Sequence, residues 1–401
     1  MHRDVRLVLM NVVVTCILLW LGSTFFGGTG VALPTAPAPG IFVWGDANCD
    51  GSLNISDPVT ILGYLFSSAP LPPACAQSFF APDQLATLQE ILPHLSRVEL
   101  DDGLGGTVPT IRLTGVNLQI VNGSGATNGN PASPNSVNGM TNGTGNLIVG
   151  YNEFGTGGNN RTGSHNLVVG SALQYERWGG AVLGQGNVIR GAWSSVTGGN
   201  ANTAIGDYAA ITGGLNNEAA GDYSSISGGQ FNASSGDIGW VGGGNANEAA
   251  GVESCVSGGA SNTALGAASA VSGGEFNSAD GDRASVAGGR ANSAVGLGAV
   301  VVGGQDNFAG GVRAAVFGGQ RNEADGTAAV VVGGGGPDPF LDGNRALGDW
   351  SVITGGRQND ATGNGSTVGG GRQNVTAPTA EYSVVAGGCL ETTFSPCELA
   401  P

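Results

Sequence analysis

GDYSSISGGQFNASSGD, residues 221–237, is rich in glycine and serine and almost free of charge. Composition alone favours a flexible linker, because the chain contains 75 glycines and only 11% charged residues. Spacing favours the opposite interpretation. Ile226 is followed two and three places later by Gly-Gly, and this pattern returns at a constant interval along the chain. A disordered linker has no reason to keep such a register, so the segment is predicted to be one coil of an ordered repeat.

The repeat has a fixed residue type at several places. We call its branched apolar residue the anchor, and the regularly spaced anchors are Val196, Ile211, Ile226, Val241, Val256, Val271, Val286, Val301, Val316 and Val331. Asparagine stands six places after the anchors (Asn202 to Asn322), a small residue eight places after (Ala204 to Ala324) and glycine ten places after (Gly206 to Gly326). Less regular spacing adds Ile148, Val168 and Val182 before these anchors, and Ile353, Val368 and Val385 after them.

This pattern predicts a mainly β fold, a parallel β-solenoid of about 15 coils with a period of 15 over residues 146–388. The anchor and the small residue two places before it are expected to point inward, because side chains alternate along a strand. The Gly-Gly pair is expected to form a turn with positive φ. Two interpretations of the asparagines stay open: a stacked ladder of amide hydrogen bonds between coils, or a turn residue chosen for its left-handed preference.

The coils SSVTGGNANTAIGD (194–207) and AAITGGLNNEAAGD (209–222) resemble the head repeats of YadA-like trimeric autotransporter adhesins. The resemblance covers roughly residues 146–388 and implies a left-handed parallel β-roll. It also implies a homotrimer with the chains side by side, and binding to a surface protein or matrix component. No heptad stalk or membrane-anchor barrel is found, so we expect a secreted head, with residues 389–401 as a C-terminal tail.

A second motif, DANCDGSLNISD (46–57), has the spacing of a calcium loop. Ca²⁺ prefers six to eight oxygen ligands at about 2.3–2.6 Å, and glycine at the sixth place, Gly51, permits the sharp turn. The alternative is an acidic turn that binds no metal. The predicted ligands are five side chains and one backbone carbonyl, that of Ser52; the side chains belong to Asp46, Asn48, Asp50, Asn54 and Asp57.

The segment GDANCDGSLNISDPVTILGYLF (45–66) resembles one calcium repeat of a type I dockerin, and those ligands match the family's positions one by one. The resemblance implies a small α-helical, EF-hand-like segment over residues 42–80 and a cohesin domain as partner. Dockerins pair two such loops, whereas only one is found here. Residues 81–100 are predicted to form an amphipathic helix that Pro93 kinks or ends, and residues 101–145 a connector rich in β-structure and turns.

The N-terminus has the layout of a secretory signal peptide over residues 1–32, followed by a linker over residues 33–41. The alternative is a signal anchor that is never cut. No second apolar run of spanning length follows, so the mature chain is expected to lack a membrane span and to be extracellular or at the cell surface. Candidate disulfides join Cys49 to Cys75 and Cys389 to Cys397; the alternative is that these thiols are unpaired.

The net charge of −16 argues against nucleic-acid binding. A few histidines, no lysine and scattered acids also argue against an enzyme. We therefore expect a non-enzymatic, calcium-binding, adhesin-like rod. The alternative is a dockerin-bearing accessory protein of extracellular polysaccharide degradation, either carbohydrate-binding or polysaccharide-acting. The insertion GGGGPDPFLDGNRALGDW (333–350) is the candidate binding loop, because it carries Phe340, Leu341, Arg345 and Trp350; the alternative is a tolerated insertion whose aromatics only pack.

Overall fold

The structure is a computed structural model that describes residues 87, 89–155, 158–336 and 343–400, and its contacts divide the chain into two compact units, residues 1–118 and 119–401. The predicted signal peptide (1–32), linker (33–41) and dockerin-like segment (42–80) lie outside the described residues.

The described part of the first unit ends in a β-hairpin. A 3-10 turn, η1 (Leu92–His94), leads into β1 (Leu95–Asp101), which pairs antiparallel with β2 (Thr107–Leu113). The prediction of a helix through residue 100 was therefore wrong in its last part. Pro93 has no N–H to continue a helix, and strand pairing from Leu95↔Leu113 onward takes over. In the hairpin turn, the carboxylate of Asp102 accepts the backbone N–H groups of Leu104 and Gly106, which lowers its pKa.

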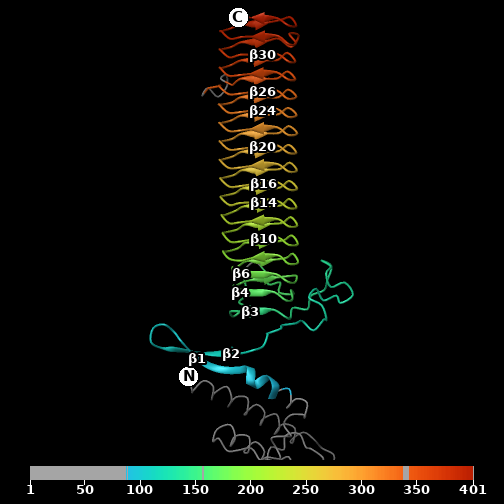
Figure 1. Ribbon diagram of the computed structural model, residues 1–401, viewed down its shortest axis with the longest axis vertical. Helices are drawn as coiled ribbons and strands as arrows, with labels where there is room; N and C mark the ends of the chain where they lie inside the picture. The colour runs from blue at the N-terminus through green and yellow to red at the C-terminus, as the bar shows by residue number, and fades with distance from the viewer. Residues whose placement is uncertain (1–86, 88, 156–157, 337–342, 401) are drawn as a thin grey trace, which may run out of the picture. The chain divides into compact units, whose positions relative to one another are not determined.

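The second unit is a stack of coils that form two parallel sheets (Figure 1). Every coil contributes one strand to the sheet that contains the anchors, which we call the anchor sheet. Its strands, in stacking order, are β3 (Leu147–Val149), β4 (Leu167–Ser171), β6 (Ala181–Gln185), β8 (Ser195–Val196), β10 (Ala210–Ile211), β12 (Ser225–Ile226), β14 (Trp240–Val241), β16 (Cys255–Val256), β18 (Ala270–Val271), β20 (Ser285–Val286), β22 (Val300–Val301), β24 (Ala315–Val316), β26 (Val330–Val331), β28 (Val352–Ile353), β30 (Thr367–Val368), β32 (Val384–Val385) and β34 (Leu399–Ala400).

The other sheet has 15 strands and we call it the alanine sheet, because alanine fills most of its inward positions. Its strands are β5 (Gln174–Tyr175), β7 (Val188–Ile189), β9 (Thr203–Ala204), β11 (Glu218–Ala219), β13 (Ala233–Ser234), β15 (Glu248–Ala249), β17 (Thr263–Ala264), β19 (Ser278–Ala279), β21 (Ser293–Ala294), β23 (Phe308–Ala309), β25 (Glu323–Ala324), β27 (Arg345–Ala346), β29 (Asp360–Ala361), β31 (Val375–Thr376) and β33 (Thr392–Thr393).

The strand register confirms the predicted solenoid and its constant period. In the regular region each anchor pairs with the anchor of the next coil, as Val271 does with Val286. The register also corrects the predicted boundary at residue 388. Residues 389–401 were expected to form a tail, but β33 and β34 continue both sheets, and Val385 pairs with Ala400 just as successive anchors pair below it. The solenoid therefore continues through the last described residues.

The core is a thin double layer. From Val168 to Val385 the anchors are fully buried, as are the alanines of the facing sheet, with Val271 and Ala279 both at 0% exposure. Ile148, in the first coil, was expected to point inward but is 39% exposed. The small residue two places before the anchor, such as Ser269 or Ala284, is buried beside them. Small side chains are required because the two sheets of one coil lie close together and leave no room for larger groups.

The asparagines form the ladder that was one of the two open interpretations. In Asn277, the side-chain amide donates to the carbonyls of Gly273 (2.9 Å) and Gly289 (3.0 Å), while its oxygen accepts the backbone N–H of Asn292 (3.0 Å). The same contacts repeat from Asn187 to Asn374. The asparagines do not have positive φ; the residue just before them does, for example Phe276 at 56°. The ladder therefore explains the asparagine, and the turn preference does not.

Replacing one asparagine should test the ladder. Asn277→Asp keeps the shape but turns the donating amide into a carboxylate that faces two carbonyl oxygens, so we expect a larger loss of stability than for Asn277→Ala. Each orphaned buried group costs about 1–3 kcal/mol. Urea unfolding followed by circular dichroism measures the difference. Asn216→Asp, at an exposed corner four coils away, is the control and should be close to neutral. Equal losses in Asn277→Asp and Asn216→Asp would contradict the ladder.

Candidate functional site

The predicted calcium ligands Asp46, Asn48, Asp50, Ser52, Asn54 and Asp57 lie outside the described residues, as do Phe340, Leu341, Cys49 and Cys75. Four of the predicted site residues are described: Arg345, Trp350, Cys389 and Cys397. All four belong to regular coils of the solenoid.

Arg345 is an outward residue of β27, held between acids of the coils on either side. Its Nε donates to Glu323 Oε2 at 3.0 Å, and its Nη1 lies 4.0 Å from Asp360 Oδ2. The hydrogen bond to Glu323 raises the pKa of Arg345, whereas burial raises the pKa of Asp360 despite the arginine nearby. Arg345 thus links three successive coils through its side chain, a structural role that sequence reasoning did not foresee.

The candidate binding loop is shorter in the structure than the predicted 333–350. Asn344 already rejoins the ladder, because its backbone N–H donates to Asn322 Oδ1 at 3.1 Å. Trp350 stands at the corner before β28, with φ of 56°, and its backbone N–H donates to Thr327 O at 2.8 Å. Its side chain is 60% exposed, so Trp350 remains accessible to a partner, but as a residue of the coil corner.

The cysteines of the last coils are free thiols in the structure, as is Cys255. The candidate disulfide between Cys389 and Cys397 is therefore not formed. The backbone of Cys389 forms an isolated parallel β-bridge with that of Arg372, just after the Gly-Gly turn. Cys397 instead occupies the corner before β34, with φ of 59°. Closeness in sequence suggested the pair, but the coil geometry places the two residues at different turns.

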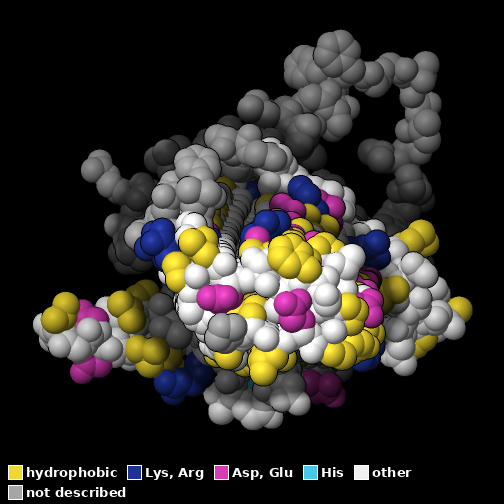
Figure 2. Space-filling view, turned by 90° about the horizontal axis from the view of Figure 1, so that it is seen from above, with side chains coloured by type: hydrophobic (Ala, Val, Ile, Leu, Met, Phe, Trp, Pro, Cys, Tyr) yellow, Lys and Arg dark blue, Asp and Glu magenta, His cyan; other side chains and the backbone are white. Residues whose placement is uncertain are grey.

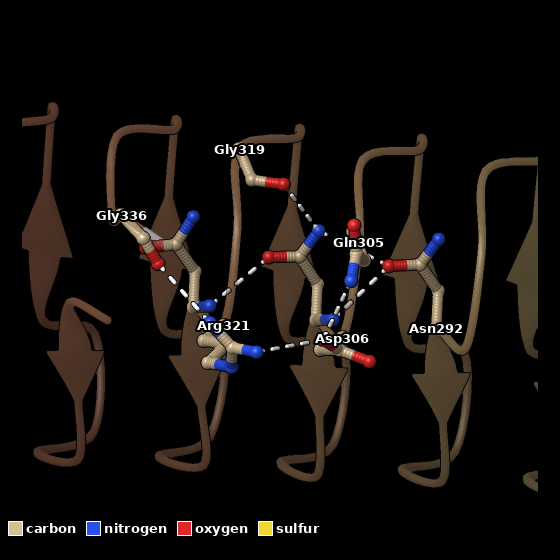
Figure 3. A network of polar contacts seen from close by, with 8 residues as sticks. Asn292, Gln305, Asp306, Gly319, Arg321 and Gly336 are labelled. Atoms are coloured by element: carbon tan, nitrogen blue, oxygen red, sulfur yellow. Dashed lines mark hydrogen bonds and ion pairs between the residues drawn. The ribbon is translucent and has the colours of Figure 1, made fainter. Parts of the chain in front are cut away.

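Charged side chains also connect coils around the asparagine ladder (Figure 3). Asp306 lies 3.5 Å from the guanidinium of Arg321 on the next coil and accepts a hydrogen bond from Gln305 Nε2 at 3.1 Å. Arg321 Nη1 in turn donates to the carbonyl of Gly336 at 3.3 Å. The charged side chains in these contacts hold adjacent coils together. They do not gather several titratable groups at one site.

A stack of aromatic rings along one corner was missed from sequence. Trp193, Tyr208 and Tyr223 occupy the same place in three successive coils, and their rings stack face to face at centroid distances of 5.0 and 4.7 Å. Trp178 meets Trp193 edge to face at 6.1 Å and is itself fully buried. These three residues are one period apart in the sequence, so extending the alignment of the coils to this position could have predicted that their rings stack.

Next to this corner, aspartate side chains connect successive coils by hydrogen bonds to the backbone. Asp207, Asp222 and Asp237 each accept the backbone N–H of the equivalent residue one coil earlier, at 2.7–3.0 Å. One carboxylate oxygen is therefore occupied by the backbone. Among the described residues, no group of three or more His, Cys, Asp or Glu side chains is arranged to hold a metal ion.

The outward surface of the anchor sheet carries no charge in any described coil. Its residues stand one place before and one place after each anchor, and we call this surface the charge-free face. From β8 to β20 it consists mainly of serine, threonine and alanine, as at Ser285 and Ala287, with Trp240 and Cys255 among them. Further on it consists of valine and phenylalanine, as at Val302 and Phe317. Between Ser194 and Val385, every described charged residue lies on the alanine sheet or on the turns between the sheets.

The last coil presents an end face with both apolar and acidic groups. Leu390, Phe394 and Leu399 are exposed there. Figure 2, which looks onto this end, shows hydrophobic side chains (yellow) with acidic ones (magenta) among them. No helix among the described residues has the length and apolarity that a membrane crossing requires.

No protein-family model matches the chain, and the search of curated proteins finds no match either. A functional interpretation therefore depends on the coil surfaces themselves and on the sequence motifs.

Proposed function

We propose that the protein is a non-enzymatic extracellular rod, an adhesin-like module that presents a repeated surface to a surface protein, a matrix component or a polysaccharide. The observation that carries the proposal is the unbroken strand register from β3 to β34. The buried asparagines and the paired charges both serve to join coils. A stack of nearly identical coils is suited to repeated contacts along a surface.

The proposal includes a homotrimer with the chains side by side, as the resemblance to YadA-like heads implies. Supporting this, the core of a single coil is thin, and ordering the residues of one coil costs on the order of 15 kcal/mol of conformational entropy. Burial against further chains adds stabilisation that one coil lacks. Sedimentation of the full chain, with and without Ca²⁺, measures the oligomeric state; a single chain at all concentrations would contradict this part.

An adhesion assay tests the function directly. Beads coated with the full chain are applied to surfaces bearing collagen, fibronectin, cellulose or xylan, and Val271→Asp, which should break the solenoid, is the control. Retention on a protein surface that the variant loses supports the adhesin. Retention on polysaccharide alone favours the accessory protein of polysaccharide degradation, and release of reducing sugar from the polysaccharide would contradict the non-enzymatic role.

Calcium binding at residues 46–57 is part of the same proposal. The full chain should take up one Ca²⁺ per chain, detected by calorimetry at up to about millimolar Ca²⁺. Asp46→Asn with Asp50→Asn removes two anionic ligands and should abolish the heat. Asp237→Asn is the matched control, because its amide oxygen can still accept the N–H of Asp222. Absence of heat in the unaltered chain would contradict the calcium site, and an undiminished heat in the double variant would contradict these ligands.

A further inference from the structure

We infer that the charge-free face is the surface through which copies of this chain associate. The inference rests on the proposed self-association and goes beyond it by assigning the surface. The candidate partner is another copy of the same chain: in the proposed homotrimer, each copy turns its charge-free face toward the axis shared by the three chains, where it meets the faces of its neighbours.

Charge is the first argument. The chain has a net charge of −16, so two copies repel each other wherever acids approach. The alanine sheet carries outward acids such as Glu218 and Glu248, and packing it against another copy would bury these charges without partners. Neither outward row of the anchor sheet holds a charged residue from β3 to β32. Of the two sheets, only this one allows close contact between like chains without that cost.

Exposed apolar surface is the second argument. From β22 to β26 the face presents Val302, Phe317 and Val332, which are 44%, 52% and 47% exposed in successive coils. Contiguous apolar groups of this kind are characteristic of protein–protein contact sites. The one tryptophan on the face does not obstruct contact: atoms of the Trp240 ring lie 3.1 Å from where a Cβ on Gly242 would stand, so the ring covers its own strand.

Size and spacing favour another copy over an unrelated partner. With strands about 4.8 Å apart, the 17 strands of the anchor sheet make a face about 77 Å long. The three residues centred on each anchor make it about 10 Å wide, so it covers about 770 Å². Stable interfaces bury about 800 Å² per partner. A second solenoid has the same coil spacing and stays in step along the whole length, whereas a surface with another spacing drifts out of step.

A matched pair of substitutions on one coil tests the assignment. Ser285 lies on the charge-free face, Ser293 on the alanine sheet, and both are half-buried. In sedimentation experiments on the full chain, Ser285→Glu and Ser285→Arg should each shift the oligomer to the mass of one chain, while Ser293→Glu should leave the oligomer intact. Mixing the Ser285→Glu and Ser285→Arg chains should restore association, because the opposite charges then meet. Circular dichroism verifies that each variant is folded.

Native thiols give a second measurement without any substitution. Cys255 lies on the charge-free face, whereas Cys389 and Cys397 are exposed at turns. Alkylation of Cys255, mapped by mass spectrometry, should slow as the protein concentration rises and the oligomer forms, while Cys389 and Cys397 keep their rates.

The outcomes distinguish self-association of the chain from the assignment of the charge-free face as its interface. An oligomer that survives both Ser285 variants, or that leaves Cys255 equally reactive at all concentrations, overturns this face as the interface and leaves self-association standing. Dissociation by Ser293→Glu alone would place the interface on the alanine sheet. A chain that is monomeric at every concentration overturns the proposed oligomer and this inference together.

Discussion

Val271→Asp should unfold the middle of the solenoid. Val271 is fully buried, pairs with Val256 and Val286, and belongs to a core built from valine and alanine. A carboxylate placed there has no cation to compensate it, because the side chains of this core are valine, alanine and serine. An unpaired buried charge costs about 3–5 kcal/mol. Because each coil contacts mainly its neighbours, the loss should also divide the single unfolding transition into two, one for each side of the break.

Urea unfolding monitored by circular dichroism measures this effect. Ser293→Asp is the control, since Ser293 points outward from β21 beside the buried Ala294, and its substitution should change stability by at most about 0.5 kcal/mol. Comparable losses in Val271→Asp and Ser293→Asp would show that the inward and outward positions have been assigned wrongly.

Gly266→Ala should separate two coils. The backbone of Gly266 does not have positive φ; what requires glycine there is the next coil, because an added Cβ would lie 2.1 Å from the carbonyl oxygen of Gly281 and 2.3 Å from its carbon. These backbone atoms cannot move aside unless the two coils separate. We therefore expect the free energy of unfolding to fall by about 3 kcal/mol or more.

The control is another glycine of the same coil pair. A Cβ on Gly258 would meet nothing within 4 Å, and its φ is not in the left-handed region. Gly258→Ala should therefore be neutral or stabilise the fold by up to about 1 kcal/mol, because alanine restricts the unfolded chain. Thermal unfolding of the two variants gives the comparison. The reverse order of stabilities would mean that the coils are not packed at the spacing described.

The period predicted the solenoid because its most repetitive positions are also its most constrained ones. Anchor, asparagine and inter-coil glycine each face an equivalent residue one coil away, so their identity can be seen in the sequence. The left-handed corners could not be found in the same way. Phe276 and Arg283 have φ of 56° and 58°, yet share no chemistry, because backbone hydrogen bonds to Ala260 and Ala267 hold them there.

The last coil was missed because its core departs from the repeat. Glu391 takes the place of the ladder asparagine, although its N–H still donates to Asn374 Oδ1 at 2.9 Å. Thr393 replaces the inward alanine, and its hydroxyl is satisfied by Ser383 at 2.9 Å. Hydrogen bonds to Asn374 and Ser383 therefore maintain the coil structure where the residues of the repeat are replaced.

Arg345 shows the converse. An arginine near an insertion resembles a binding residue, but its ion pairs depend on Glu323 of the coil before and Asp360 of the coil after. These acids are distant in the sequence, and only the coil geometry brings them to the guanidinium. The structural role of Arg345 therefore could not be predicted from its own segment.

The strand register also determines how the solenoid would respond to a mechanical load. The hydrogen bonds between coils run along the stack: backbone N–H groups of one coil donate to carbonyls of the next, as Ser257 does to Val271 at 2.9 Å. Tension applied between β3 and β34 therefore acts along the direction of these bonds and loads successive coils in series. We expect the coils to detach one at a time. Each released coil lengthens the chain by about 45–50 Å, the extended length of its residues less one strand spacing. A rod of this design would yield in many small steps, each of which dissipates work while the remaining coils stay folded.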